Sequence, residues 1–356
     1  MARLRLIRRD IQEPDLESCL IGGNWTSPSR CFRSTDAEGR VVVQRKLTGA
    51  KLIPFFEKLR PCLVGIEACA TAHHWGRKLG ELGHEVKLMP PSYVKPYLKR
   101  QKNDAADAEA ICEAVTRPSM RFVEVKSPEQ QSVLVIHRTR MTLMRHRIEL
   151  SNTIRAHMAE FGLAAPIGRL GLQGLIEIIR DDADERVPAH ARICLKLLAD
   201  QLDLVNRQAL ETDRMIMANA RATDVGRRLM AMPGVGPVLA SAIVASVPDP
   251  HAFRSGRNLS AWIGLVPKQN SSGGKERLGG ITKQGNRYLR QLLVLGALSV
   301  IRYAERHGSK RPWLVQLMAR RTTKIAAVAL ANKMGRMIWA IMTSGEAYRE
   351  PQLRAA

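Results

Sequence analysis

The pattern of apolar and polar positions changes character near residue 127. Before it, short apolar or β-branched runs alternate with amphipathic segments, and CLVGIEA has the composition of a buried strand. The predicted strands are Arg40–Leu47, Cys62–Ala68 and 84–90, and the predicted helices are 71–82 and 104–115. Strands that alternate with helices predict an α/β sheet domain, which we place at residues 1–126. Residues 1–35 show no sustained period and predict no element.

After residue 127 the apolar period becomes helical. Ser127 and Pro128 have the residue types of a helix start. Apolar residues then recur at three- and four-residue steps in two long segments, separated by the glycine- and proline-containing stretch Gly162–Pro188. This predicts an antiparallel coiled-coil hairpin at residues 127–224. Its apolar stripes favour a core and a dimer seam over a cofactor site.

The rest of the chain predicts a mainly helical domain at 225–310 and a helical tail at 311–356. Pro233-Gly234-Val235-Gly236 lies between two helical patterns and has the form of a helix-hairpin-helix. Glycines permit a tight turn whose backbone N–H groups can approach a phosphate, so Gly234 and Gly236 are candidate nucleic-acid contacts. An ordinary joint between two helices is the alternative.

The net charge of the chain indicates a class of binding partner. The 356 residues include 56 Lys and Arg against 33 Asp and Glu, a formal net charge of +23. Such an excess attracts polyanions, of which nucleic acid is the commonest. A basic protein without such a partner is the alternative, and charge alone does not separate DNA from RNA.

The cysteines and the hydropathy predict a cytoplasmic protein. The six cysteines form no CxxC pair and no cluster with histidine, which favours reduced thiols over disulfides or zinc. No apolar run has the ~18 residues of a membrane span, and no signal sequence opens the chain. We therefore expect no membrane partner.

Three acidic residues are candidate metal ligands. Glu67 lies in the predicted buried strand, where a carboxylate is costly without a partner. Asp104 and Asp107 are three residues apart at the start of a predicted helix, so they share a face. Converging carboxylates suit Mg²⁺ or Mn²⁺, which can assist phosphoryl transfer. The alternative is that Asp104 caps the helix, Asp107 is a solvated charge in its first turn and Glu67 is an ordinary residue at the end of the strand.

Two basic segments are candidate nucleic-acid contacts. In YVKPYLKRQKN, tyrosines are interleaved with Lys95, Lys99, Arg100 and Lys102, which suits phosphate binding and base stacking, although a solvated loop fits equally. The second segment, 264–290, places serines and glycines among cations. Its candidate residues are Ser271, Ser272, Lys275, Arg277, Lys283, Arg287 and Arg290.

A hydroxyl among fixed cations suits nucleophilic attack on a phosphodiester. The segment contains no GxSxG motif, which argues against an esterase or protease triad. A loop that holds phosphate without covalent chemistry is the alternative.

These segments, in this order, resemble the insertion-sequence one-ten transposases from about Asp36 to the C-terminus. The resemblance implies a RuvC-like (RNase H-like) domain with a DEDD tetrad, a coiled coil and a C-terminal domain with a nucleophilic serine. By motif, Glu67, Asp104 and Asp107 match three tetrad positions. Ser272, which precedes a glycine, is our choice for the serine, with Ser271 as the fallback. The implied partners are DNA, a structured guide RNA and further copies of the chain.

The first tetrad position departs from the family pattern. Asn24 stands in the register of the aspartate of a G-x-D-L-A-K motif. Codons can be chosen for NWTSPSRCFRST that read L-D-L-A-K-S-L-F-Q-V-H in a frame shifted by two bases, so we hypothesise a local frameshift. An amide is a poorer metal ligand than a carboxylate, which predicts impaired activity.

The sequence thus predicts a transposase that uses a metal-bound acidic site and a serine. A nuclease without a covalent intermediate and a catalytically inactive DNA- or RNA-binding remnant are the alternatives.

Overall fold

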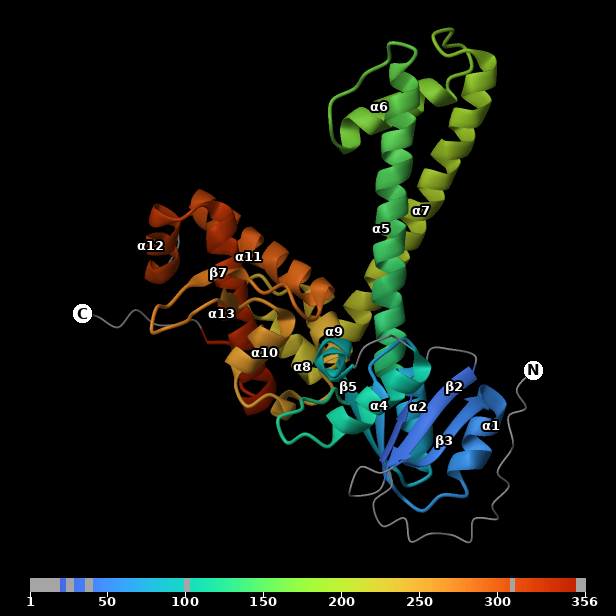
Figure 1. The fold of residues 1–356 in the computed structure, drawn as a ribbon. Helices are drawn as coiled ribbons and strands as arrows, with labels where there is room; N and C mark the ends of the chain where they lie inside the picture. The colour runs from blue at the N-terminus through green and yellow to red at the C-terminus, as the bar shows by residue number, and fades with distance from the viewer. Residues whose placement is uncertain (1–19, 24–28, 36–40, 99–102, 308–310, 350–356) are drawn as a thin grey trace. The chain divides into compact units, whose positions relative to one another are not determined.

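The computed structural model describes residues 20–23, 29–35, 41–98, 103–307 and 311–349 (Figure 1). The chain divides into two compact units, Met1–Ser127 and Pro128–Ala356. Asn24, Lys99, Arg100 and Lys102 lie outside the described residues.

Unit 1 is built on a five-stranded mixed sheet. Its strands are β1 (Leu20–Gly23), β2 (Ser29–Thr35), β3 (Val41–Thr48), β4 (Leu63–Glu67) and β5 (Glu85–Met89), in the order β3-β2-β1-β4-β5. The β1–β2 and β2–β3 pairs are antiparallel, and the β1–β4 and β4–β5 pairs are parallel. The α/β prediction is confirmed, but β1 and β2 arise where the sequence predicted no element.

Helices cover both faces of this sheet. The helical elements of unit 1 are α1 (Gly49–Phe56), α2 (Ala72–Glu81), α3 (Pro91–Val94), η1 (Lys95–Tyr97) and α4 (Asp104–Val115). Val64 and Ile66 share a buried cluster with α1 and α2. Gly65, which points to the opposite face because strand side chains alternate, lies against α4.

Unit 2 begins with two long helices, α5 (Pro128–Ala159) and α7 (Ala189–Ala222), which pack side by side (Figure 1). The predicted helix start at Pro128 is confirmed. The sequence did not predict α6 (Arg169–Arg180), which lies between them in the chain. Buried residues of all three helices, among them Ile154, Ile176 and Leu195, form one apolar cluster.

The remainder of unit 2 is mainly helical. Its elements are α8 (Asp224–Met230), α9 (Pro237–Ser246), η2 (Pro250–Ala252), α10 (Gly256–Ile263), β6 (Pro267–Gln269), β7 (Leu278–Ile281), α11 (Arg287–His307), α12 (Pro312–Arg320) and α13 (Thr323–Ser344). By length and composition α13 is apolar enough to cross a membrane, so the expectation that no apolar segment reaches that length was wrong. Its buried residues, such as Leu330 and Ile338, belong to the largest apolar cluster of the unit, as in a core helix.

Candidate functional site

The acidic residues of unit 1 lie at the end of β4 and in the first turn of α4. Glu67 is the last residue of β4 and is half-buried. Asp104 begins α4 and is half-buried, whereas Asp107 is only 9% exposed. Asn103 caps the helix by accepting a hydrogen bond from Ala106 N at 2.8 Å. The cap is therefore not Asp104, so the interpretation of that residue as a helix cap was wrong.

Gly65 explains why α4 packs closely on β4. A Cβ at this position would lie 3.0 Å from Cγ2 of Ile111 and 3.1 Å from Cβ of Val115. Glu67 follows Gly65 by two residues and shares its face of the sheet. Asp107 precedes Ile111 by four residues and shares its face of the helix. The two carboxylates thus belong to the two surfaces that meet at Gly65.

The chemistry of the acidic residues suits a hard cation, but they do not form a closed ligand set. Carboxylate oxygens are the donors that Mg²⁺ and Mn²⁺ prefer. Among the described residues, however, no group of three or more His, Cys, Asp or Glu side chains is arranged to hold a metal ion. Strand β1 ends at Gly23, which pairs with Ile66, and the fourth candidate position follows it outside the described residues. An ion would have to draw these side chains together.

The described part of the basic segment before α4 spans the end of α3 and the short helix η1. Lys95 is exposed in η1, and Tyr93 is 40% exposed. The ring of Tyr97 is half-buried, with the guanidinium carbon of Arg117 6.0 Å from its centroid. Tyr93 therefore presents more of its ring to solvent than Tyr97 does.

The serines of unit 2 lie at the tip of a two-stranded antiparallel hairpin formed by β6 and β7. Gly273 and Gly274 both have positive φ, 56° and 75°, as the two central residues of a type I′ turn require. Ser272 and Lys275 flank these glycines, and Lys275 N donates to Ser272 O at 3.1 Å. Residues 271–280 are all exposed. The turn therefore holds a serine and a lysine next to each other at an exposed tip.

The two adjacent serines differ in their partners. Ser271 Oγ accepts a hydrogen bond from Arg277 N at 3.1 Å. Within the described parts of the chain, the side chain of Ser272 has no hydrogen-bond partner. Lys275 and Arg277 are exposed beside it. The hydroxyl of Ser272 is therefore the more available of the two.

The base of the hairpin is fixed by backbone contacts that only glycine allows. A Cβ on Gly285, whose φ is 75°, would lie 1.7 Å from Trp262 O. A Cβ on Gly264, whose φ is 83°, would lie 2.0 Å from Gln284 O. These contacts join the end of α10 to the start of α11. The hairpin consequently projects from a rigid base.

Arg290 belongs to this base. Its Nη1 donates to Ile263 O at 2.7 Å and to Gln284 O at 3.0 Å. Burial, followed by the nearby charge of Arg287, lowers the pKa of Arg290. Arg287 and Lys283 are exposed. Lys283 also has a φ of 58°, a conformation that is uncommon for residues other than glycine. Arg290 thus stabilises the hairpin base, while the other two cations face solvent.

The Pro233–Gly236 turn contains two glycines with different surroundings. A Cβ on Gly234, whose φ is 85°, would lie 2.8 Å from Gly296 O of α11. A Cβ on Gly236 would meet nothing within 4 Å, and this residue is the N-cap of α9. Gly234 therefore serves the packing of the turn on α11, whereas Gly236 leaves the N-terminus of α9 open to an incoming group.

A buried polar chain in unit 2 was not found by sequence reasoning. His137, 1% exposed on α5, lies with Nδ1 3.0 Å from Tyr288 Oη and Nε2 3.0 Å from Ser241 Oγ. Ser241 Oγ donates to Asn219 Oδ1 at 2.8 Å. Since that hydroxyl has one proton, Nε2–H of His137 donates to Ser241 and Tyr288 O–H donates to Nδ1. A histidine at an apolar position of the stripe was the only signal in the sequence.

Comparison with known proteins identifies the family. Residues 34–162 match a family model described as "Transposase", and residues 226–311 match "Transposase IS116/IS110/IS902 family". The chain is 46% identical over 316 residues to a "Probable family 20 transposase" of Pseudomonas aeruginosa, covering 88% of this chain and 94% of that protein.

Two further relatives are named for insertion sequences. The chain is 33% identical to the "Transposase for insertion sequence element IS1328" of Yersinia enterocolitica, covering 92% of this chain and 98% of that protein. It is 39% identical to the "Transposase for insertion sequence element IS1111A" of Coxiella burnetii, with 88% and 86% covered. The chain therefore belongs to the IS116/IS110/IS902 family of transposases, whose members are DNA-processing enzymes.

Proposed function

We propose that this transposase excises and inserts its element by using Ser272 as the nucleophile in DNA strand cleavage and exchange. The observation that carries the proposal is the exposed turn in which the side chain of Ser272 has no partner among the described residues and Lys275 is its neighbour. Ser271 is the less suitable nucleophile because its Oγ is already held by Arg277 N.

The reaction is a pair of phosphoryl transfers. Ser272 Oγ forms a bond to phosphorus, the bond from phosphorus to a deoxyribose oxygen breaks, and that oxygen takes up a proton as the serine loses one. A DNA hydroxyl then attacks the serine-linked phosphorus and releases the serine. The number of phosphoester bonds is unchanged, so no external energy source is needed. Lys275 and Arg277, which are exposed on the same hairpin, would stabilise charge that develops on the phosphate oxygens.

We also propose that Glu67, Asp104 and Asp107 bind Mg²⁺ or Mn²⁺ when DNA is present. A divalent ion would supply charge stabilisation to the phosphate and its leaving oxygen. The packing of α4 on β4 at Gly65, which brings the faces of Glu67 and Asp107 together, supports this assignment. The strand order β3-β2-β1-β4-β5 supports our proposal that unit 1 has a RuvC-like fold.

We propose that the strand-cleavage activity of this protein is impaired. Asn24 stands at the expected position of the first tetrad aspartate, and an amide adds no negative charge to the site. The described carboxylates alone form no three-ligand group. The same two observations favour one second candidate, a catalytically inactive remnant that binds DNA or RNA.

We propose the remaining partners from the net charge of the chain and from its resemblance to the family. The net charge of +23 suits both DNA and the structured guide RNA that the resemblance implies. Gly234 and Gly236 would form the turn of a helix-hairpin-helix, with the open N-terminus of α9 next to a phosphate. We propose that the active form is a cytoplasmic homo-oligomer.

A trapping experiment tests the nucleophile. The purified protein carrying Asn24→Asp is incubated with Mg²⁺, with RNA transcribed from the flanking region and with end-labelled DNA that spans the element's own ends. Denaturing gels then report protein–DNA adducts. We expect an adduct that Ser272→Ala abolishes and that the matched neighbour Ser271→Ala retains. Strand cleavage without an adduct, or an adduct that survives Ser272→Ala, would contradict the proposal.

A further inference from the structure

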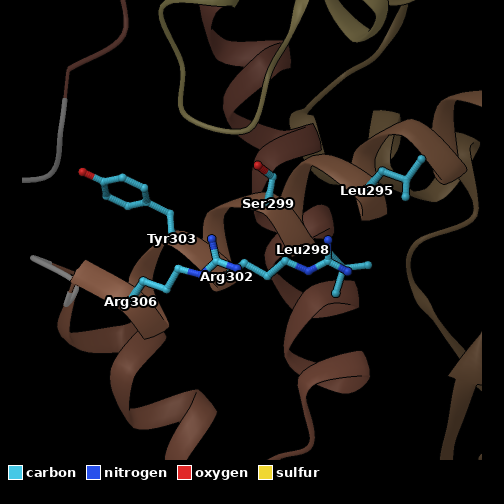
Figure 2. A pocket seen from close by; sticks show the side chains of 6 residues that line it. All are labelled: Leu295, Leu298, Ser299, Arg302, Tyr303 and Arg306. Atoms are coloured by element: carbon cyan, nitrogen blue, oxygen red, sulfur yellow. The ribbon is translucent and has the colours of Figure 1, made fainter. Parts of the chain in front are cut away.

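The face of α11 next to the Pro233–Gly236 turn carries a hollow that the proposed reaction does not use. Six residues line a cavity of about 370 Å³, and all of them project from this single helix (Figure 2). They are Leu295, Leu298, Ser299, Arg302, Tyr303 and Arg306. Their spacing of three, one, three, one and three residues is that of one continuous helical stripe. The stripe is about 16 Å long at the ~1.5 Å rise of an α-helix.

A second hollow lies next to the first. It has a volume of about 510 Å³ and is lined by the Pro233–Gly236 turn, the first turn of α9 and further residues of α11. Ser299 lines both hollows. The turn lies directly on α11, because a Cβ on Gly296 would lie 2.1 Å from Gly234 O. The stripe and the open N-terminus of α9 are therefore neighbours, and we call the two hollows together the groove.

The chemistry of the groove combines cations with apolar surface. Arg302 and Arg306 are exposed and one helical turn apart, and neither forms an ion pair within the residues that the structure describes. Tyr303 is 66% exposed and Leu295 is 60% exposed. Glu305 is also exposed on α11 but does not line the hollow. Exposed apolar and aromatic side chains next to cations that form no ion pair within the described residues are typical of a binding surface.

We propose that this groove binds a single-stranded segment of DNA, with Arg302 and Arg306 on its phosphates and the ring of Tyr303 stacked on a base. Stacking on exposed aromatic rings together with cationic contacts is how proteins hold unpaired strands. A duplex would not use the groove in this way, because its bases are stacked on each other. The stripe matches about five nucleotides at the ~3.4 Å rise of a stacked strand.

A second copy of the chain is a less suitable occupant. A symmetric contact of the stripe with itself would bury Arg302 and Arg306 of both copies in one contact, and no acidic residue lines the hollow. Burying unpaired like charges is costly. Phosphates, in contrast, supply the opposite charge, and family membership makes DNA the relevant polyanion.

The test measures binding of fluorescently labelled dT12 to the full-length protein by anisotropy, in EDTA and at several salt concentrations. Under these conditions no metal-dependent strand cleavage contributes, so the result does not depend on Ser272 or on the acidic residues. The test variant is Arg302→Gln with Arg306→Gln. The matched control is Arg320→Gln with Arg321→Gln, which removes two exposed charges outside the groove.

We expect the test variant to weaken dT12 binding at least tenfold relative to wild type and to lower the slope of log affinity against log salt by about 1.4, or ~0.7 for each lost contact. The control should change affinity less than twofold. Tyr303→Leu should weaken binding by roughly 5- to 150-fold, the cost of one lost stacking contact, whereas Tyr303→Phe keeps the ring and the affinity. Circular dichroism and thermal unfolding verify that each variant is folded.

Three outcomes would overturn the proposal. Equal affinity of the test and control variants for dT12 would show that the groove does not bind DNA. A loss of rU12 binding without a loss of dT12 binding would identify RNA as the occupant. A change in mass by light scattering in the test variant, with dT12 affinity unchanged, would identify an interface between protein copies.

Discussion

His137 and Tyr288 are joined by a hydrogen bond of 3.0 Å across 151 positions of the sequence. His137 belongs to the long helix α5, and Tyr288 is the second residue of α11, just after the serine hairpin. The contact thus ties the start of α11 to the two-helix hairpin. Since Ser241 on α9 accepts from the other ring nitrogen, the neutral imidazole positions three helices.

Low pH should destabilise the contacts of His137 with Tyr288 and Ser241. Burial, with a smaller contribution from the charge of Arg140, lowers the pKa of His137 to about 4, below the ordinary 6.5. The stabilisation from the neutral ring is therefore fully present above pH 6.5 and is lost as the pH falls toward 4. At its limit the loss is about 3 kcal/mol.

Urea unfolding at pH 7.5 and pH 4.5 measures this effect. His137→Gln removes the titration but keeps a donor and an acceptor, so its stability should fall less between the two pH values than that of wild type. Both proteins have the same carboxylates, so the effect of carboxylate titration cancels when the two losses of unfolding free energy are compared. Equal losses would contradict a buried neutral His137.

Substitution of Gly234 should affect folding, whereas substitution of Gly236 should affect DNA binding. Gly234→Ala places a Cβ 2.8 Å from Gly296 O at a positive φ, and we expect it to lower the unfolding free energy by ~1–3 kcal/mol. Gly236→Ala meets no atom, so the fold should persist. Its methyl group should nevertheless weaken DNA binding, because it obstructs a phosphate at the start of α9. Unchanged DNA affinity in Gly236→Ala, measured by anisotropy, would argue against contact through this turn.

Two arginines of the serine segment should also behave differently. Arg290 donates to two carbonyls, so Arg290→Ala should cost about 1–3 kcal/mol of stability. Arg287 is exposed, so Arg287→Ala should change stability by less than ~0.5 kcal/mol. The same change should lower the salt dependence of DNA binding by about one unit. Thermal unfolding and anisotropy at several salt concentrations measure the two effects, and a large stability loss in Arg287→Ala would refute the distinction.

Restoring the missing carboxylate should increase metal-dependent activity. Asn24→Asp adds a charged oxygen donor, so we expect strand cleavage in Mg²⁺ to rise at least ~10-fold. Asn24→Gln is the control, since it changes the side chain without adding charge. A chain in which the eleven residues L-D-L-A-K-S-L-F-Q-V-H replace the twelve residues 24–35, which places the aspartate at position 25, tests the frameshift hypothesis together with the nucleotide sequence. Cleavage that is no stronger in either restored protein would argue for a remnant.

Local patterns in the sequence predicted those elements that have a clear composition of their own. The strand that contains Glu67 was placed correctly from its continuous apolar run, and the helix at Asp104–Val115 from its alanine- and glutamate-rich, helix-forming composition. Strands β1 and β2 were not predicted, since their neighbours in the sheet determine them.

The same limit applies to the sites. The type I′ turn beside Ser272 follows from two adjacent glycines. The carbonyl partners of Arg290, the buried position of His137 and the hollow beside Arg302 depend on contacts between distant segments, which a single sequence does not show.

The most direct measurement is mass spectrometry of the peptide that carries DNA after protease and nuclease digestion of the trapped adduct from the Asn24→Asp protein. We predict a nucleotide phosphate on Ser272. A nucleotide on Ser271 or on any other residue, or adduct-free cleavage products, would contradict the central claim that Ser272 forms the covalent link to DNA.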